Sequence, residues 1–150
     1  MEVRRWRIFL DTSALIAGVV SPTGAAREVL RLAEARIIDL VVSRQVLTEA
    51  DRNLSSKLPA ALTDYRALLV RLAPHVVEDP SVRAVREAAR VIHQKDAPSL
   101  AAARVADVDY LVSWDTRHFR TDAVRSFVRF PVVTPGEFLR SFRQTPPTDL

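Results

Sequence analysis

The stretch Trp6-Arg7-Ile8-Phe9-Leu10-Asp11-Thr12-Ser13-Ala14-Leu15 carries the strongest indication of the fold. A mostly apolar run leads straight into an acid, two hydroxyl residues and a helix-like segment. A short apolar run bounded by a polar turn is typical of a buried strand in a parallel sheet. Asp11 then stands at the carboxyl end of that strand, the edge where open α/β sheets build their sites. The alternative is an ordinary helix cap, with Thr12 or Ser13 capping and Asp11 in the turn.

The bulk composition is that of one globular domain. The chain has 150 residues, of which 48% are hydrophobic and 27% charged, enough for a single continuous core. It has no cysteine, which excludes disulfides, thiolate zinc sites and cysteine nucleophiles. With only three histidines available, the metal that the sequence favours is a hard cation bound by oxygen.

Charge and hydropathy limit which partners and which cellular compartment the sequence is compatible with. No apolar run approaches the roughly 18 residues that span a bilayer, and the N-terminus lacks a secretory signal, so we expect a cytoplasmic protein without a membrane partner. The net charge is +4, and all but two of the 22 basic residues are arginines. Arginine suits phosphate because its planar fork can bind two oxygens, although a compositional bias of the source genome explains the count equally well.

Strand-like and helix-like segments alternate along the chain, which predicts an α/β fold with helices on both faces of a parallel sheet. The expected architecture is a three-layer α/β/α sandwich around a central, mostly five-stranded parallel sheet. We expect one domain over residues 1–142 and a flexible tail over 143–150. The expected strands are 6–11, 37–42, 75–78, 110–114 and 128–134, and the expected helices are 14–20 (or a turn), 23–36, 43–56, 60–72, 81–92, 96–106, 121–126 and 135–142.

Four acids fall at one edge of this predicted sheet. Asp11 ends the first strand and Asp115 follows the fourth. Asp96 starts the helix that leads into the fourth strand, and Glu49 lies on the helix after the second. Because strand ends and the following helix starts share one edge, these carboxylates can meet there. Clustered carboxylates repel one another, and a divalent cation bound by oxygen, Mg²⁺ or Mn²⁺, resolves the repulsion.

Each acid also has an ordinary structural interpretation. Asp96 followed by Pro98 is a sound helix cap, Glu49 a solvated helix residue, and Asp115 a turn acid. The combination favours a site, because four acids share the predicted edge while others fall elsewhere. Those others are Asp39, Asp51, Asp64 and Asp122.

Four ordered motifs resemble the PIN domain, and in particular the bacterial PIN proteins that include toxins of toxin–antitoxin pairs. They are Leu-Asp-Thr-Ser-Ala-Leu-Ile at 10–16, Val-Leu-Thr-Glu-Ala around Glu49, Lys-Asp-Ala-Pro-Ser-Leu-Ala-Ala-Ala at 95–103, and Asp-Tyr-Leu-Val-Ser-Trp-Asp-Thr-Arg-His-Phe at 109–119. The resemblance covers roughly 7–142. It implies a metal-dependent endoribonuclease with a five-stranded parallel sheet, whose catalytic and metal-binding acids are Asp11, Glu49, Asp96 and Asp115.

The resemblance also implies roles for neighbouring residues. Ser13 and Thr116 match hydroxyl positions that orient a water or a carboxylate. One or two Mg²⁺ or Mn²⁺ ions would activate a water for in-line attack on RNA, leaving a 5′-phosphate and a 3′-hydroxyl. Some members carry a further acid after the fourth, where this chain has Thr116, so the number of ions stays open. Arg117 and Arg120 are candidates for substrate phosphates, with a solvated loop as the alternative.

The expected partners are an RNA substrate and either a cognate antitoxin or a second copy of the chain. The helices at 43–56 and 60–72 could offer a docking groove, although burial within the monomer is their default role. Competing functions are a non-catalytic RNA- or protein-binding module and a phosphatase with Asp11 as nucleophile. The phosphatase usually needs a second acid two residues on, where this chain has Ser13. Three glycines are too few for the phosphate loop of a dinucleotide-binding domain.

The sequence does not identify the target RNA, or whether DNA is also cut. Among the aromatic residues, Trp6 and Trp114 adjoin apolar strands and are expected in the core, and four phenylalanines read as packing residues. His118 follows the fourth acid closely, but a loop or packing role is its ordinary interpretation. The phenylalanines are Phe127, Phe130, Phe138 and Phe142.

Overall fold

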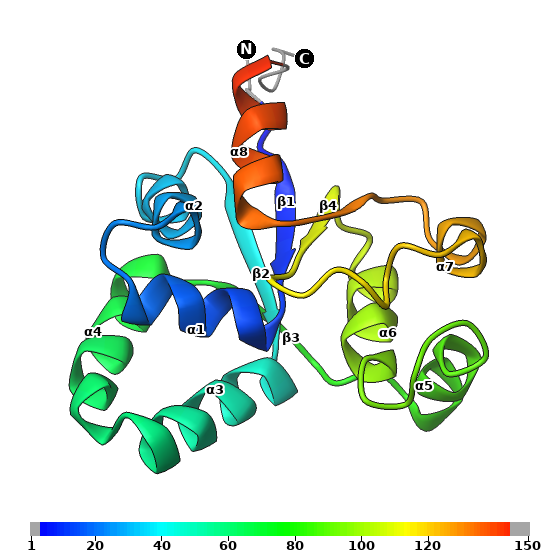
Figure 1. The fold of residues 1–150 in the computed structure, drawn as a ribbon, viewed down its shortest axis with the longest axis horizontal. Helices are drawn as coiled ribbons and strands as arrows, with labels where there is room; N and C mark the ends of the chain where they lie inside the picture. The colour runs from blue at the N-terminus through cyan, green and yellow to red at the C-terminus, as the bar shows by residue number, and fades with distance from the viewer. Residues whose placement is uncertain (1–3, 145–150) are drawn as a thin grey trace.

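The computed structural model describes residues 4–144, and within them a five-stranded sheet is covered by helices on both faces. The prediction of an α/β sandwich around a parallel sheet is confirmed (Figure 1). The strands are β1 (Arg7–Leu10), β2 (Asp39–Ser43), β3 (His75–Val77), β4 (Tyr110–Val112) and β5 (Val132–Val133). The helices are α1 (Thr12–Val20), α2 (Ala25–Glu34), α3 (Arg44–Lys57), the 3₁₀ turn η1 (Pro59–Ala61), α4 (Leu62–Leu72), α5 (Val82–Ala88), α6 (Ala97–Ala106), α7 (Asp122–Phe127) and α8 (Pro135–Gln144).

The strand order places the first strand at the centre of the sheet. It runs β3-β2-β1-β4-β5, and every pairing is parallel. The chain moves outward from β1 to β3 in one direction, then returns across the sheet to β4 and β5. Because parallel crossovers are right-handed, this reversal puts α1–α4 on one face and α5–α7 on the other, as Figure 1 shows. The topology therefore switches direction between β1 and β4.

Apolar sequence runs account for the core. Ile8, Phe9 and Leu10 of β1 are fully or almost fully buried because both faces of a central parallel strand are covered by helices. Gly18 permits the close approach of α1 and α2, since a Cβ at that position would lie 2.6 Å from Leu30 Cδ1. In residues 4–144 no helix is both long and apolar enough to cross a membrane.

The structure departs from the sequence expectations at several boundaries. The first helix begins at Thr12, directly after the strand, because Asp11 is its N-cap. The last strand keeps only Val132–Val133 of the expected 128–134, since α7 continues through Phe127 and the chain needs the remaining residues to return to the sheet. The last helix continues to Gln144, while 145–150 of the expected tail lie outside the described residues.

A capping box starts the last helix. The Thr134 hydroxyl accepts from the Glu137 backbone N–H at 3.2 Å, and the Glu137 carboxylate accepts from the Thr134 N–H at 2.9 Å. Arg120 pairs with the same carboxylate. The Thr134 N–H bond first, and Arg120 second, lower the pKa of Glu137 to about 2.

Glu137 should make stability depend on pH in the acid range. A carboxyl whose pKa is lower in the folded state stabilises the fold above its ordinary pKa, and this contribution is lost as the pH falls towards the folded value of about 2. We expect Glu137→Gln to be less stable than the natural chain near neutral pH and nearly equal to it at strongly acid pH. Urea unfolding of both proteins across that range measures the difference. A constant gap between the two curves would contradict the assignment.

Candidate active site

The first candidate residue, Asp11, lies where the topology of the sheet reverses. The register pairs Leu10 of β1 with Val112 of β4, so the residues that follow these strands, Asp11 and Ser113, face each other. The backbone N–H of Asp11 donates to the Val112 carbonyl at 3.1 Å, which extends the pairing by one step. In open parallel sheets this crevice outside the strand ends is the usual place for a ligand.

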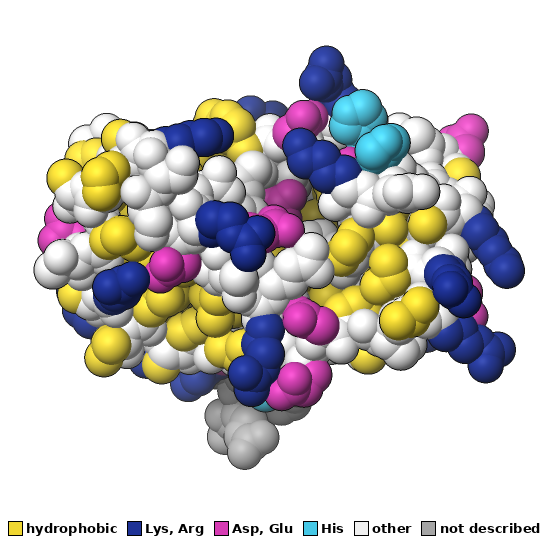
Figure 2. All heavy atoms as spheres, turned by 90° about the horizontal axis from the view of Figure 1, so that it is seen from below, with side chains coloured by type: hydrophobic (Ala, Val, Ile, Leu, Met, Phe, Trp, Pro, Cys, Tyr) yellow, Lys and Arg dark blue, Asp and Glu magenta, His cyan; other side chains and the backbone are white. Residues whose placement is uncertain are grey.

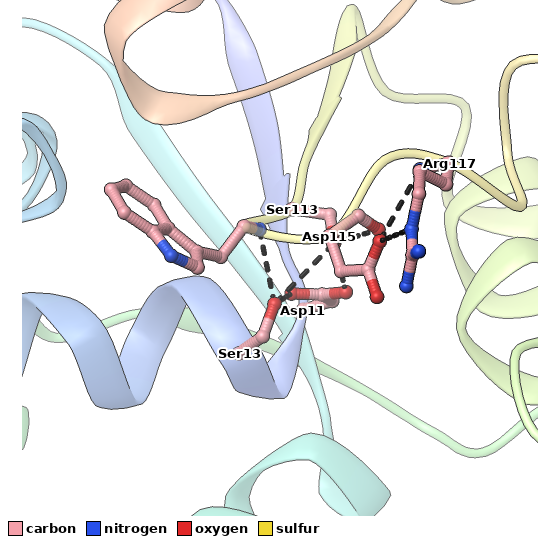
Figure 3. A network of polar contacts seen from close by, with 6 residues as sticks. Asp11, Ser13, Ser113, Asp115 and Arg117 are labelled. Atoms are coloured by element: carbon pink, nitrogen blue, oxygen red, sulfur yellow. Dashed lines mark hydrogen bonds and ion pairs between the residues drawn. The ribbon is translucent and has the colours of Figure 1, made fainter.

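Asp11 is held by three donors, of which the Ser13 and Ser113 hydroxyls are drawn in Figure 3. Its Oδ1 accepts from the Ser13 hydroxyl at 2.7 Å and from the Ala14 backbone N–H at 3.2 Å. Its Oδ2 accepts from the Ser113 hydroxyl at 2.6 Å. The Ala14 contact is the N-cap of α1, so one carboxylate both caps the helix and faces the crevice. The sequence alternative, in which Thr12 or Ser13 caps this helix and Asp11 is only a turn residue, is wrong, because Asp11 itself is the N-cap.

Burial and a neighbouring acid act against ionisation of Asp11. Burial raises its pKa, the hydrogen bonds from Ser113, Ser13 and Ala14 lower it, and the charge of Asp96 raises it. The net result is a pKa above the ordinary value for aspartate. A carboxylate in this position gains from a nearby cation, because a positive charge offsets both the desolvation and the repulsion.

Glu49 reaches the same crevice from α3. Its Oε2 accepts from the Thr12 hydroxyl at 2.9 Å, and its Oε1 accepts from the Gln45 side-chain amide at 3.0 Å. The two hydroxyls after Asp11 thus donate to different carboxylates: the Ser13 hydroxyl to Asp11 and the Thr12 hydroxyl to Glu49. The Asp-Thr-Ser sequence at the start of α1 links two carboxylates that are far apart in the chain.

Asp96 occupies the N-cap position of α6 without acting as a cap. Its backbone is helical, with φ −96° and ψ −11°, and its side chain makes no capping hydrogen bond. An N-cap residue normally adopts an extended backbone so that its side chain can turn back to the helix N–H groups. Here the preceding turn runs directly into the helix, and the Asp96 carboxylate makes no capping bond. Asp96 lines the crevice instead, and its charge raises the pKa of Asp11.

Asp115 follows β4 on the exposed side of the site. The backbone N–H of Arg117 donates to its Oδ1 at 3.3 Å, and Arg117 Nε lies 3.5 Å from the same oxygen (Figure 3). The side-chain and backbone bonds from Arg117 hold the pKa of Asp115 below its ordinary value. The pKa of Asp11 is therefore raised, whereas the pKa of Asp115 is lowered.

All four acids line one cleft of about 520 Å³. Figure 2 views the molecule towards the carboxyl ends of the strands. Asp and Glu side chains lie in and around a hollow on this face, with basic and histidine side chains beside them. The four are brought together from four different parts of the chain: the end of β1, α3, the start of α6 and the loop after β4. The residues that line the cleft are Asp11, Thr12, Ser13, Ile16, Glu49, Asn53, Lys95, Asp96, Ser99, Ser113, Asp115 and His118.

The other residues suggested by the sequence are placed differently. Ser13 lies in the cleft and bonds Asp11, whereas Thr116 does not line it. Arg117 bonds Asp115 and remains strongly exposed. Arg120 turns away, because its guanidinium pairs with Glu137 and donates to a backbone carbonyl of β5. The substrate role suggested for Arg120 has no geometric support here.

Several residues of the cleft were missed by the sequence analysis. Ser113 is only 1% exposed and bonds Asp11, and Thr12 bonds Glu49. The strand register contains the signal for Ser113, since it follows β4 where Asp11 follows β1. Lys95 and His118 add basic groups to the cleft wall. The expectation that Trp114 is a core residue is wrong, because its side chain is 58% exposed.

The donor set fits a divalent cation in kind. The cleft offers carboxylate and hydroxyl oxygens and no sulfur, the chemistry that Mg²⁺ and Mn²⁺ prefer. Within residues 4–144 no three Asp, Glu or His side chains converge closely enough to form a closed metal cage. Mg²⁺ does not need such a cage, because it keeps several waters and is usually bound through one or two carboxylates. Asp11 and Asp96 both line this cleft, and the charge of Asp96 raises the pKa of Asp11.

A model of the PIN domain family matches residues 7–117 of the chain. This segment contains all four acids of the cleft and the strands β1 to β4. The chain belongs to the PIN domain family. The resemblance noted in the sequence is thereby confirmed as a family relationship.

Solved structures share the fold at low sequence identity. The VapBC2 structure from Rickettsia felis, bound to a promoter DNA fragment, aligns at TM-score 0.62 and 15% identity, covering 85% of this chain and 96% of that one. FitAcB from Neisseria gonorrhoeae aligns at TM-score 0.60 and 18% identity over 86% and 98%. VapC20 from Mycobacterium tuberculosis, a sarcin–ricin-loop-cleaving toxin, aligns at TM-score 0.54 and 21% identity over 74% and 92%. No protein with a curated description matches by sequence.

Proposed function

We propose that the protein is a divalent-metal-dependent endoribonuclease and the toxin of a toxin–antitoxin pair. The observation that carries this proposal is the gathering of four carboxylates in one cleft at the reversal point of the sheet. Membership of the PIN domain family supports a nuclease. The fold shared with a sarcin–ricin-loop-cleaving toxin supports RNA as the substrate.

The residues of the chain would share the work as follows. Asp11 and Asp96 would hold Mg²⁺ or Mn²⁺, with Glu49 and Asp115 on the walls of the cleft as further ligands of the ion or its waters. A bound divalent ion supplies charge neutralisation at the phosphate oxygens and a lowered pKa for a coordinated water. Ser13 and Ser113 fix the orientation of Asp11 through short hydrogen bonds, so the carboxylate need not reorganise when substrate binds.

The basic residues around the cleft suit the charge of the RNA backbone. Lys95 and His118 line the cleft beside the acids, and Arg117 extends beyond Asp115. A phosphodiester attracted to these side chains would have its scissile phosphorus close to the four carboxylates of the cleft. Arg117 also neutralises Asp115, which reduces the repulsion between the cleft and the phosphate.

A protein partner follows from the toxin role. VapBC2 and FitAcB, which share the fold, support an assembly with a cognate antitoxin. The apolar sides of α3 and α4 are largely used within the monomer, where Leu54, Leu68 and Leu72 are buried. An antitoxin would therefore meet the exposed sides of these helices or the cleft itself.

Metal titration in an RNA cleavage assay tests the proposal. The full chain, stripped with EDTA, should cut single-stranded RNA only after Mg²⁺ or Mn²⁺ is added, and the products should carry 5′-phosphates. A DNA strand of the same sequence, run in parallel, defines the sugar preference. Equal cutting in EDTA, or no cutting with either ion over a panel of RNAs, would overturn the proposal.

A further inference from the structure

Trp114 has an exposed side chain, and although it does not itself line the cleft, its chain neighbours Ser113 and Asp115 do. It is 58% accessible, whereas Trp6 is 9% accessible, and it stands between Ser113 and Asp115. Leaving an indole in water forgoes the large stabilisation that burial of an aromatic side chain supplies. Among the strongly exposed large hydrophobic residues in residues 4–144, Trp114 is the aromatic one, and the rest are aliphatic.

The backbone that carries this ring is anchored to the acids. The Trp114 N–H donates to the Ser13 hydroxyl oxygen at 3.0 Å, and the same hydroxyl donates to Asp11 at 2.7 Å. The preceding residue, Ser113, is buried and bonds the other oxygen of Asp11. Figure 3 shows Ser13, Ser113 and Asp11 joined in this network. The backbone of Trp114 is therefore tied to the carboxylate that is proposed to hold the metal.

We propose that Trp114 is a stacking platform for an unpaired nucleobase of the RNA, next to the phosphate that is cut; this inference rests on the proposed function. A flat aromatic face accepts any base, since every base has a π-face, and stacking orients the strand without reading its sequence. The neighbouring Arg117, strongly exposed on the other side of Asp115, can meet the backbone of the same strand.

An aliphatic patch would suit a protein partner, but an exposed indole between two residues of an acid cleft suits a base. The chain then prefers single-stranded or looped RNA, because the faces of paired bases are already stacked on their neighbours within a helix. Trp114 is thus a substrate-binding residue and takes no part in the bond-breaking step.

Tryptophan fluorescence tests the inference directly, because the chain contains only two tryptophans. In a Trp6→Phe variant, Trp114 is the one remaining indole. This variant is titrated with a mixed-sequence single-stranded RNA of about ten nucleotides, a length within the range of single-strand sites. Ca²⁺ replaces Mg²⁺, and a gel verifies that the RNA stays intact. We expect saturable quenching and protection of the indole from iodide.

Three substitutions and one altered ligand complete the design. Trp114→Ala should weaken RNA binding and raise KM by about 5- to 100-fold, and Trp114→Phe should recover part of this loss. Val70→Ala, which also removes an exposed apolar side chain, should leave binding unchanged. A strand of equal length and charge with abasic positions should bind without quenching.

The outcomes separate this inference from the proposed function. If the natural chain cuts RNA but Trp114→Ala binds and cuts it equally well, or the abasic strand quenches equally, stacking is overturned and the nuclease stands. If no RNA is cut but RNA still quenches Trp114, the nuclease is overturned, and with it the position of the base beside a cut phosphate, while stacking of RNA on Trp114 stands. Emission that responds to protein concentration, and not to RNA, would assign the ring to an interface between two copies and overturn stacking.

Discussion

Asp11→Asn is expected to lower the rate of RNA cleavage by on the order of 10³-fold or more while the chain stays folded. A metal ion contributes several kcal/mol of charge stabilisation, and each 1.36 kcal/mol is a factor of about ten in rate. Removing the charge of the carboxylate that Ser13 and Ser113 orient should forfeit most of this contribution. Initial rates at saturating Mg²⁺ measure the loss.

The stability of this variant provides an internal check. Asn caps a helix about as well as Asp, so the bond to the Ala14 N–H is retained. Burial raises the pKa of Asp11, which means that its ionised form destabilises the fold, and that this cost grows as the pH rises through the ordinary and then the raised pKa. At neutral pH the Asn variant should therefore melt at the same temperature as the natural chain, or higher.

Two further variants make the result specific. Asp122→Asn removes an acid that is fully exposed on α7, outside the cleft, and should cut RNA at the natural rate. Asp11→Ala removes the cap as well as the charge and should cost about 1 kcal/mol of stability. Equal cleavage by Asp11→Asn and the natural chain would exclude Asp11 from the site.

Phe138→Ala is expected to reduce the free energy of unfolding by about 3–5 kcal/mol, the usual cost of deleting a buried phenyl group. The Phe138 ring is fully buried and packs edge-on to Tyr110 at a centroid distance of 5.2 Å and to Trp6 at 6.2 Å. It joins α8 to the sheet at the amino end of β1, the end opposite the cleft. Since whole domains are stable by only about 5–15 kcal/mol, this is a large fraction of the total.

Urea unfolding measures the effect, and Phe142→Ala is the matched control because Phe142 belongs to the same aromatic cluster but is only partly buried. The control should lose less stability than Phe138→Ala. The folded fraction of both variants should retain the natural rate of cleavage, since the cluster does not touch the cleft. A loss below about 1 kcal/mol for Phe138→Ala would mean that α8 does not complete the core.

The features that the sequence predicts well are those encoded locally. The apolar run before Asp11 identifies the central strand, and the alternation of strands and helices identifies the parallel sheet. These signals suffice to place Asp11, Glu49, Asp96 and Asp115 at one edge, where the structure also places them. Their role as metal ligands remains a prediction.

The features that the sequence misses depend on contacts between distant segments. Arg120 is drawn from the cleft by Glu137, which lies 17 positions later in the sequence. Trp114 follows an apolar strand and resembles a core residue, yet the strand ends at Val112 and the ring is exposed. Asp96 has the sequence of a cap, but its helical backbone prevents the capping bond. Each outcome requires the three-dimensional arrangement.

The central position of β1 has a consequence for synthesis on the ribosome. Asp11 is made 102 residues before its hydrogen-bonding partner Ser113, and the fourth acid, Asp115, comes later still. A growing chain therefore lacks part of its acid set until Asp115 has been translated, and domains complete their folding only when such segments have emerged. The cleft that gathers the four acids is thus complete only after β4 has been made and has paired with β1.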